Sequence, residues 1–201
     1  MAGCSPEAQR GSKSTPATVD TETMNSVRKY EYADAMGKRL VIDNSLPKSS
    51  LNYTDPNGKK YVYAVFWTQI TNETIHPVEL KIDFPLDSFE FPRSSGNYLK
   101  LRIPSDTMTL DKASLSDYGL DVKSLLDTGI NNAHSLKRTI QPKESTAFYV
   151  VTLSNGGAGG ALRTGLSLKG QNLVYKTSLF NNSTPELALM DMKEIHCGSI
   201  K

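Results

Sequence analysis

The sequence predicts an all-β fold, an antiparallel β-sandwich, on three observations. The chain has 201 residues, of which 38% are hydrophobic, and this length and composition suit one domain with a buried core. From residue 39 onward, hydrophobic and polar residues alternate with a period of two, as in strands with one buried face. Clusters of Gly, Asn, Asp and Pro separate the alternating stretches and are typical of turns.

The alternating stretches define the expected strands in chain order. The first, 39–43, ends at Asn44-Ser45, and the second, 61–71, is hydrophobic in both phases, which predicts a central strand covered on two sides with Trp67 in the core. The third, 76–84, is hydrophobic in one phase, and Pro77 indicates an edge or a strand start because it lacks an N–H. Further strands are expected at 99–103, 148–153, 162–168, 173–176 and 187–195.

Seven or eight strands with such turns favour a sandwich of the immunoglobulin-like type. The name is used for the architecture alone, because the cysteine pair of immunoglobulin domains is absent.

Residues 104–138 depart from the strand pattern and predict a partly helical crossover between strands. Asp121 is a suitable N-cap, Val122, Leu125 and Leu126 form a helical hydrophobic stripe, and Gly129 stands at a C-cap position. A second helical turn is expected at 114–118. A crossover of this length is a common place for a specialised surface and equally for a simple cover over the core.

Residues 1–37 are expected to form a flexible N-terminal tether, and residues 38–201 a single β-sandwich domain. Residues 2–20 contain one large hydrophobic residue, Val19. Such a segment buries too little surface to offset the entropy lost on ordering.

At the start of this tether, Ala2-Gly3-Cys4 resembles the end of the lipobox of bacterial lipoproteins, with Met1 where the lipobox has leucine. The resemblance implies that the Cys4 thiol carries a diacylglyceryl group and that the protein belongs to the cell envelope. Ser5, in place of Asp, resembles the signal for the outer membrane, with the domain facing the periplasm. A flexible tether would hold that domain clear of the bilayer. The alternative is a cytoplasmic protein with an unmodified cysteine.

Charge and hydropathy exclude several classes of partner. The 23 basic and 21 acidic residues leave a net charge of +2, too small to indicate nucleic-acid binding. No hydrophobic run approaches the ~18 residues that a membrane-spanning helix requires. The two cysteines, Cys4 and Cys197, are too few for a disulfide scaffold and leave open whether Cys197 is free. The expected partners are a membrane, through the lipid, and either an envelope protein or a glycan.

No catalytic residue, metal site or cofactor is predicted. His76, His134 and His196 lack the close spacing of a zinc site, and the Gly-x-Ser-x-Gly motif of serine hydrolases is absent. Carboxylates near Phe84-Pro85 keep open a hydrolase with its site in the 86–138 region, although solvated loop charges explain them better.

Three tyrosines in turn or crossover segments, Tyr53, Tyr98 and Tyr118, are candidate ligand-binding residues, because exposed aromatic rings stack on sugars. The preferred function is non-catalytic, namely a lipid-anchored envelope protein that acts by binding or as an accessory subunit of a larger assembly. The first alternative is a carbohydrate-binding module that uses these tyrosines. Both rest on analogy with other envelope domains of this architecture.

Overall fold

The computed structural model describes residues 19–23, 27–33, 39–90, 96–129, 134–156, 161–180 and 189–201. The strands are β1 (Val19–Thr23), β2 (Val27–Ala33), β3 (Arg39–Ser45), β4 (Lys48–Thr54), β5 (Lys60–Asn72), β6 (Val78–Asp83), β7 (Phe89–Glu90), β8 (Tyr98–Arg102), β9 (Ser135–Ile140), β10 (Ser145–Ser154), β11 (Ala161–Lys169), β12 (Asn172–Phe180) and β13 (Leu189–Ile200). Between β8 and β9 lie two 3-10 helices, η1 (Leu110–Ser114) and η2 (Ser116–Gly119), and the helix α1 (Val122–Gly129).

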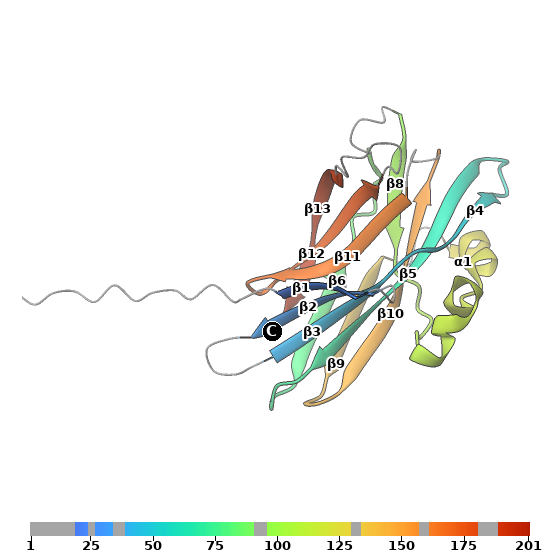
Figure 1. Cartoon of the computed structure of the whole chain (residues 1–201). Coiled ribbons are helices and arrows are strands. Elements are labelled where there is room, and N and C mark those ends of the chain that lie inside the picture. The colour runs from blue at the N-terminus through green and yellow to red at the C-terminus, as the bar shows by residue number, and fades with distance from the viewer. Residues whose placement is uncertain are drawn as a thin grey trace, which may run out of the picture.

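Within the described part of the chain, the strands form two sheets whose pairings are all antiparallel. The larger sheet has the order β1-β2-β3-β5-β10-β8-β7, with β4 also paired to β5, and the smaller has the order β11-β12-β13-β6-β9 (Figure 1). The all-β, antiparallel prediction is therefore confirmed.

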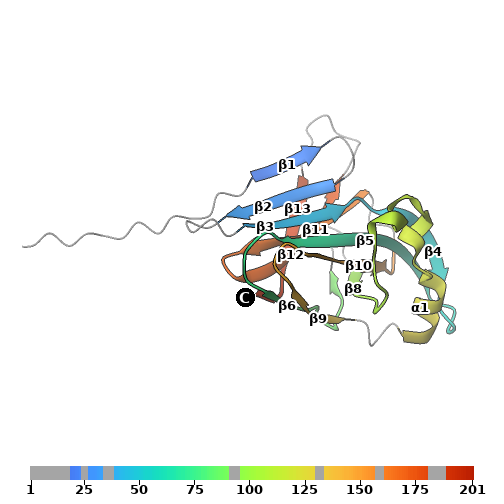
Figure 2. The ribbon, with the colours of Figure 1, turned by 90° about the horizontal axis from the view of Figure 1, so that it is seen from below.

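The molecule has three layers. Inward-facing residues of both sheets, among them Phe66, Ile82 and Tyr175, form the main core between the sheets. A second core lies on the other face of the larger sheet, where Trp67 and Tyr149 pack against Leu126 of α1. Figures 1 and 2 both place α1 beyond β5 and β10, on the side away from β6, β12 and β13. The larger sheet is thus the middle layer.

Strand β5 explains why this sheet is covered twice. Side chains alternate between the two faces of a strand, and Ala64 and Phe66 enter the main core whereas Val65 and Trp67 enter the second. The two-phase hydrophobic pattern of 61–71 predicted this arrangement, and the core position of Trp67 is confirmed.

Asn44 of β3 connects the two sheets at the edge of β11. Its Nδ2 donates to the carbonyl of Leu166 at 3.0 Å, and its Oδ1 accepts from the N–H of the same residue at 2.8 Å. The side chain therefore replaces a neighbouring strand for Leu166, in a position where Asn44 is 2% exposed. A Cβ on Gly165 would lie 3.3 Å from Asn44 Cγ, so glycine makes room for this close approach.

The predicted boundary between tether and domain, at residues 37 and 38, is too late. Strands β1 and β2 precede it and extend the larger sheet beyond β3. Tyr30 and Tyr32 of β2 are buried in the main core, and Leu168 N–H donates to the Tyr32 hydroxyl at 2.8 Å. The proposed lipid attachment at Cys4 lies outside the described residues.

Candidate functional site

The crossover packs flat on the outer face of the larger sheet. We call its residues 104–129 the crossover platform. The prediction of a helix after Asp121 is confirmed, since Asp121 Oδ1 accepts from the N–H of Ser124 at 3.0 Å, and Val122 and Leu126 are buried. Helix α1 thereby covers the second core and fixes one end of the platform.

Lys48 of β4 holds the other end. Its Nζ donates to the carbonyls of Ala113 at 2.6 Å and Leu115 at 2.8 Å, and it lies 4.6 Å from the centre of the Tyr118 ring. Lys48 thus supplies a donor to the Ala113 carbonyl in the last turn of η1 and shares the Leu115 carbonyl with the N–H of Tyr118. The cation also gains from the aromatic face.

Three successive residues of η2 adopt left-handed backbone angles: φ is 47° at Asp117, 54° at Tyr118 and 72° at Gly119. This conformation costs a residue with a side chain ~1–2 kcal/mol, so surrounding contacts must impose it. Those contacts are present, because the Tyr149 hydroxyl donates to Tyr118 O at 2.8 Å and the Tyr118 hydroxyl donates to Leu46 O at 2.7 Å. The turn is therefore held in one geometry.

Asp117 adds a carboxylate to this strained turn. The Tyr63 hydroxyl donates to Asp117 Oδ2 at 3.2 Å, and burial, followed by the Asp117 charge, raises the pKa of Tyr63. Asp117 Oδ1 is buried and has no hydrogen-bond partner among the described residues. A buried acceptor without a partner is costly, which makes this turn the most strained part of the platform.

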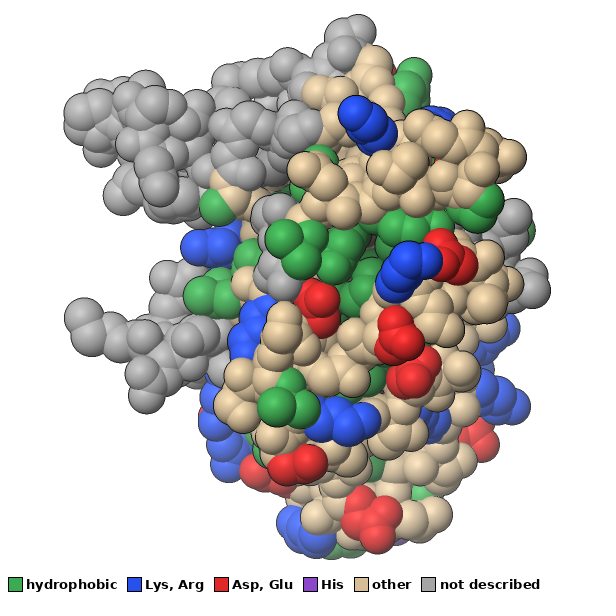
Figure 3. Space-filling model, turned by 90° about the vertical axis from the view of Figure 1, so that its right-hand side faces the viewer, with side chains coloured by type: hydrophobic (Ala, Val, Ile, Leu, Met, Phe, Trp, Pro, Cys, Tyr) green, Lys and Arg blue, Asp and Glu red, His purple; other side chains and the backbone are tan. Residues whose placement is uncertain are grey.

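The outer surface of the platform combines hydrophobic and acidic side chains. Leu110 and Leu115 are 54% and 51% exposed. The segment 104–129 has five aspartates but only two basic residues, a net charge of −3 in a chain of net charge +2. Figure 3, which faces this side, shows hydrophobic side chains with both acidic and basic side chains around them. The aspartates are Asp106, Asp111, Asp117, Asp121 and Asp127.

The structure separates the three candidate tyrosines, and the expected exposure of two of them is wrong. Tyr53 is 7% exposed because the platform packs over it, and Tyr118, itself a platform residue, is 5% exposed because its ring packs in the second core. Tyr98, at the start of β8, is 44% exposed. The Tyr53 hydroxyl donates to Asp127 Oδ1 at 2.8 Å, and burial, followed by this bond, raises the pKa of Tyr53 to about 12. These rings do not form one stacking surface.

The histidines and Cys197 offer no site either. His134 Nε2 lies 3.8 Å from Asp83 Oδ1, and no group of three His, Cys, Asp or Glu residues that could hold a metal ion occurs in the described ranges. Cys197 is a free, buried thiol whose pKa burial raises to about 12. The thiolate, not the thiol, is the reactive form, so Cys197 is an unreactive core residue.

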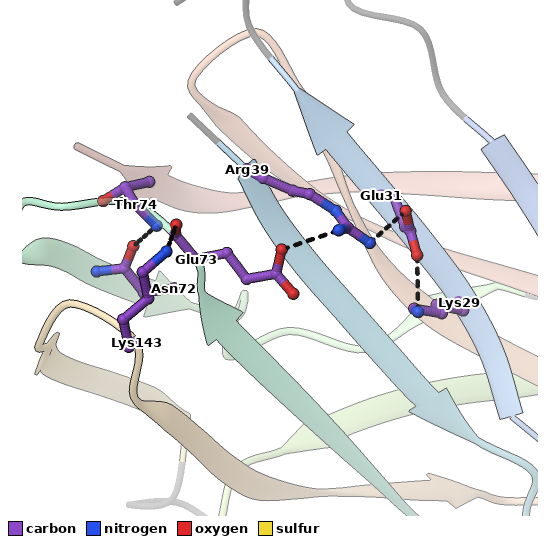
Figure 4. Close-up of polar contacts among 7 residues, drawn as sticks. All are labelled: Lys29, Glu31, Arg39, Asn72, Glu73, Thr74 and Lys143. Atoms are coloured by element: carbon purple, nitrogen blue, oxygen red, sulfur yellow. Dashed lines mark hydrogen bonds and ion pairs between the residues drawn. The ribbon is translucent and has the colours of Figure 1, made fainter. Parts of the chain in front are cut away.

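A second polar cluster lies at the ends of β2, β3 and β5 (Figure 4). Lys29 and Arg39 each lie 2.7 Å from Glu31, and Arg39 also lies 3.1 Å from Glu73. The hydrogen bond from Lys29 lowers the pKa of Glu31. Buried Asn72 donates to backbone carbonyls beside the turn, at 2.8 Å to His76 O. The positive and negative side chains of this cluster pair with one another, so we interpret the cluster as structural.

Sequence reasoning missed Lys48, Leu110 and Leu115. Nothing in the local pattern around Lys48 indicates its role, because its partners lie more than sixty residues away. Leu110 and Leu115 carried a usable signal, since they are large hydrophobic residues outside any predicted strand or helical stripe.

Comparison with known proteins gave no match: no protein-family model, no curated protein and no solved structure is similar to this chain. Among the described residues, no helix is long and apolar enough to cross a membrane.

Proposed function

We propose that the protein is a lipid-anchored envelope protein that acts without catalysis, as an accessory subunit that binds a protein partner through the crossover platform. The observation that carries the proposal is the half-exposure of Leu110 and Leu115 on a rigid backbone. Exposed hydrophobic side chains within a polar rim are typical of interaction surfaces. Lys48 and the left-handed turn keep this surface in one geometry, which reduces the entropy lost on binding.

The location is part of the same proposal. The lipobox-like Ala2-Gly3-Cys4, followed by Ser5, supports a lipid on Cys4 and residence at the outer membrane, facing the periplasm. We further propose that the two sheets form a sandwich of the immunoglobulin-like type, which the main core between two antiparallel sheets supports.

Site-specific photocrosslinking in envelope fractions tests the binding surface. A photoreactive residue at Leu115 is expected to yield one major crosslinked protein species. The same residue at Leu86, which is equally exposed but lies outside the platform, is the matched control and should yield none. Equal crosslinking at both positions would contradict a specific platform, and recovery of glycan alone would favour the carbohydrate-binding module.

Mass spectrometry tests the location. Protein isolated from native envelopes is expected to carry a diacylglyceryl group on Cys4, and a Cys4→Ser variant should leave the membrane fraction. An unmodified Cys4 in the native protein would overturn the proposed location at the outer membrane.

A further inference from the structure

The outer face of the smaller sheet carries an excess of positive charge. The alternation of β6 places Leu80 and Ile82 in the core and turns Lys81 outward. The strand pairings place further charged residues on the same side, and we call this set the basic face. Its members are five lysines, Lys81, Lys137, Lys169, Lys176 and Lys201, one arginine, Arg163, and three acidic residues, Glu79, Asp83 and Glu194.

Two of these lysines face each other across a strand pair, with Glu79 and Asp83 on either side of Lys81 along β6. Lys81 and Lys137 lie directly opposite each other on β6 and β9, and both are exposed. Like charges directly opposite in a sheet are destabilising. No salt bridge to either lysine occurs within the described ranges, whereas Glu194 pairs with both Lys169 and Lys176. An acidic partner would relieve the repulsion between Lys81 and Lys137.

The same chain carries a negatively charged surface on its opposite side. The crossover platform covers one face of the larger sheet, and the smaller sheet covers the other, so the basic face and the platform point away from each other (Figure 2). The platform has a net charge of −3, and the basic face has three more positive than negative residues. The aliphatic stems of lysines can also cover exposed leucine side chains.

We infer that copies of this protein associate head to tail, with the crossover platform of one copy on the basic face of the next. This inference rests on the proposed function, because it uses the same platform and names a second copy as the partner. A contact between two different surfaces leaves one of each free at the ends, so association continues into open chains unless rotation closes a ring. Opposite charges across the contact make the association salt-dependent.

Two variants, each with one surface disabled, test the inference by sedimentation velocity. Leu110→Ser with Leu115→Ser disables the platform, and Lys81→Glu with Lys137→Glu disables the basic face. The unaltered protein should form larger species as its concentration rises, and added salt should reverse this. Each variant alone should be monomeric, with a dissociation constant raised at least about tenfold. An equimolar mixture should form a one-to-one dimer and nothing larger, because one intact contact remains.

Matched controls make the same chemical changes elsewhere. Ile75→Ser with Leu86→Ser removes two exposed hydrophobic residues outside both surfaces, and Lys59→Glu with Lys60→Glu makes the same charge change at the β4–β5 turn. Both controls should associate like the unaltered protein. Circular dichroism of every variant shows whether it is folded, and single substitutions at the same positions replace any double variant that is not.

The inference is overturned if the unaltered protein is monomeric at all concentrations, or if the mixed variants form no dimer. It is also overturned if the platform variant is monomeric while the basic-face variant still dimerises, which indicates a symmetric contact. Crosslinking of Leu115 to a different envelope protein, together with a monomeric protein in solution, refutes self-association and leaves the proposed function intact.

Discussion

Replacement of Asn44 tests whether one side chain closes the sandwich at the edge of β11. In Asn44→Leu the N–H and C=O of Leu166 and the hydroxyl of Thr68 lose their partners on Asn44, which lie at 2.8, 3.0 and 2.9 Å. All three groups are buried between the sheets. A leucine of similar size adds hydrophobic contact but no hydrogen bond.

The expected loss follows from the cost of leaving buried polar groups without partners, ~1–3 kcal/mol for each group. The Thr68 hydroxyl can rotate toward another acceptor, so we count chiefly the two backbone groups of Leu166. After the gain from the added hydrophobic contact, Asn44→Leu should lower the free energy of unfolding by about 3 kcal/mol. That is a large share of the ~5–15 kcal/mol that stabilises a typical domain.

Denaturant unfolding measures the loss, with the fluorescence of Trp67, the single tryptophan, as the probe. The same substitution at exposed Asn52 of β4 is the matched control and should change stability by less than ~0.5 kcal/mol. A loss below about 1 kcal/mol in Asn44→Leu would refute the reasoning, because the Leu166 groups would then have found water or another partner.

Three further predictions concern single residues. Lys143 has a φ of 67°, a conformation that glycine adopts more easily than residues with a side chain. The Lys143→Gly variant should therefore be about 1 kcal/mol more stable than Lys143→Ala in denaturant unfolding. Equal stabilities of the two variants would contradict backbone strain at this position. Cys197 is buried and its pKa is raised to about 12, so it should react with thiol reagents only after the protein unfolds. The measurement uses a Cys4→Ser variant, in which Cys197 is the one remaining thiol. Fast labelling of the native variant would contradict the prediction, because it would show that the core opens. The pKa of Tyr53 is raised to about 12 in the folded protein, from an ordinary 10 in the unfolded chain, so the unfolded chain loses this proton first as the pH rises. The contribution of the protonated Tyr53 hydroxyl to the stability of the fold is therefore complete below pH 10 and is lost as the pH rises to 12. An ultraviolet titration should show one fewer late-ionising tyrosine in Tyr53→Phe, and an unchanged late fraction would refute the assignment.

The sequence determined the features that depend on neighbours along the chain. The hydrophobic residues in both phases of 61–71 specified β5 with two buried faces, and the alternation in 76–84 specified β6 with one, because residues two apart in a strand share a face. Asp121 specified the start of α1, because an N-cap is a contact between a side chain and the backbone three residues on. The turn before β5 contains Asp55-Pro56-Asn57-Gly58, one of the clusters of Gly, Asn, Asp and Pro that are typical of turns, and Gly58 has a φ of 80°.

The tertiary structure alone decided which polar and aromatic residues are buried. Tyr53 and Tyr118 looked like exposed turn residues, but both rings are buried in the second core. The Tyr53 hydroxyl donates to Asp127 of the crossover platform, whereas the hydroxyl of Tyr118, a platform residue, donates to the carbonyl of Leu46. Tyr30 and Tyr32 are buried because β2 joins the sheet, a pairing that the short, charged alternation of 27–33 did not reveal. Asn44 bonds to Leu166, a residue 122 positions away. Local patterns record the period of a strand, but burial depends on which distant surface packs over it, and only the folded chain brings those surfaces together.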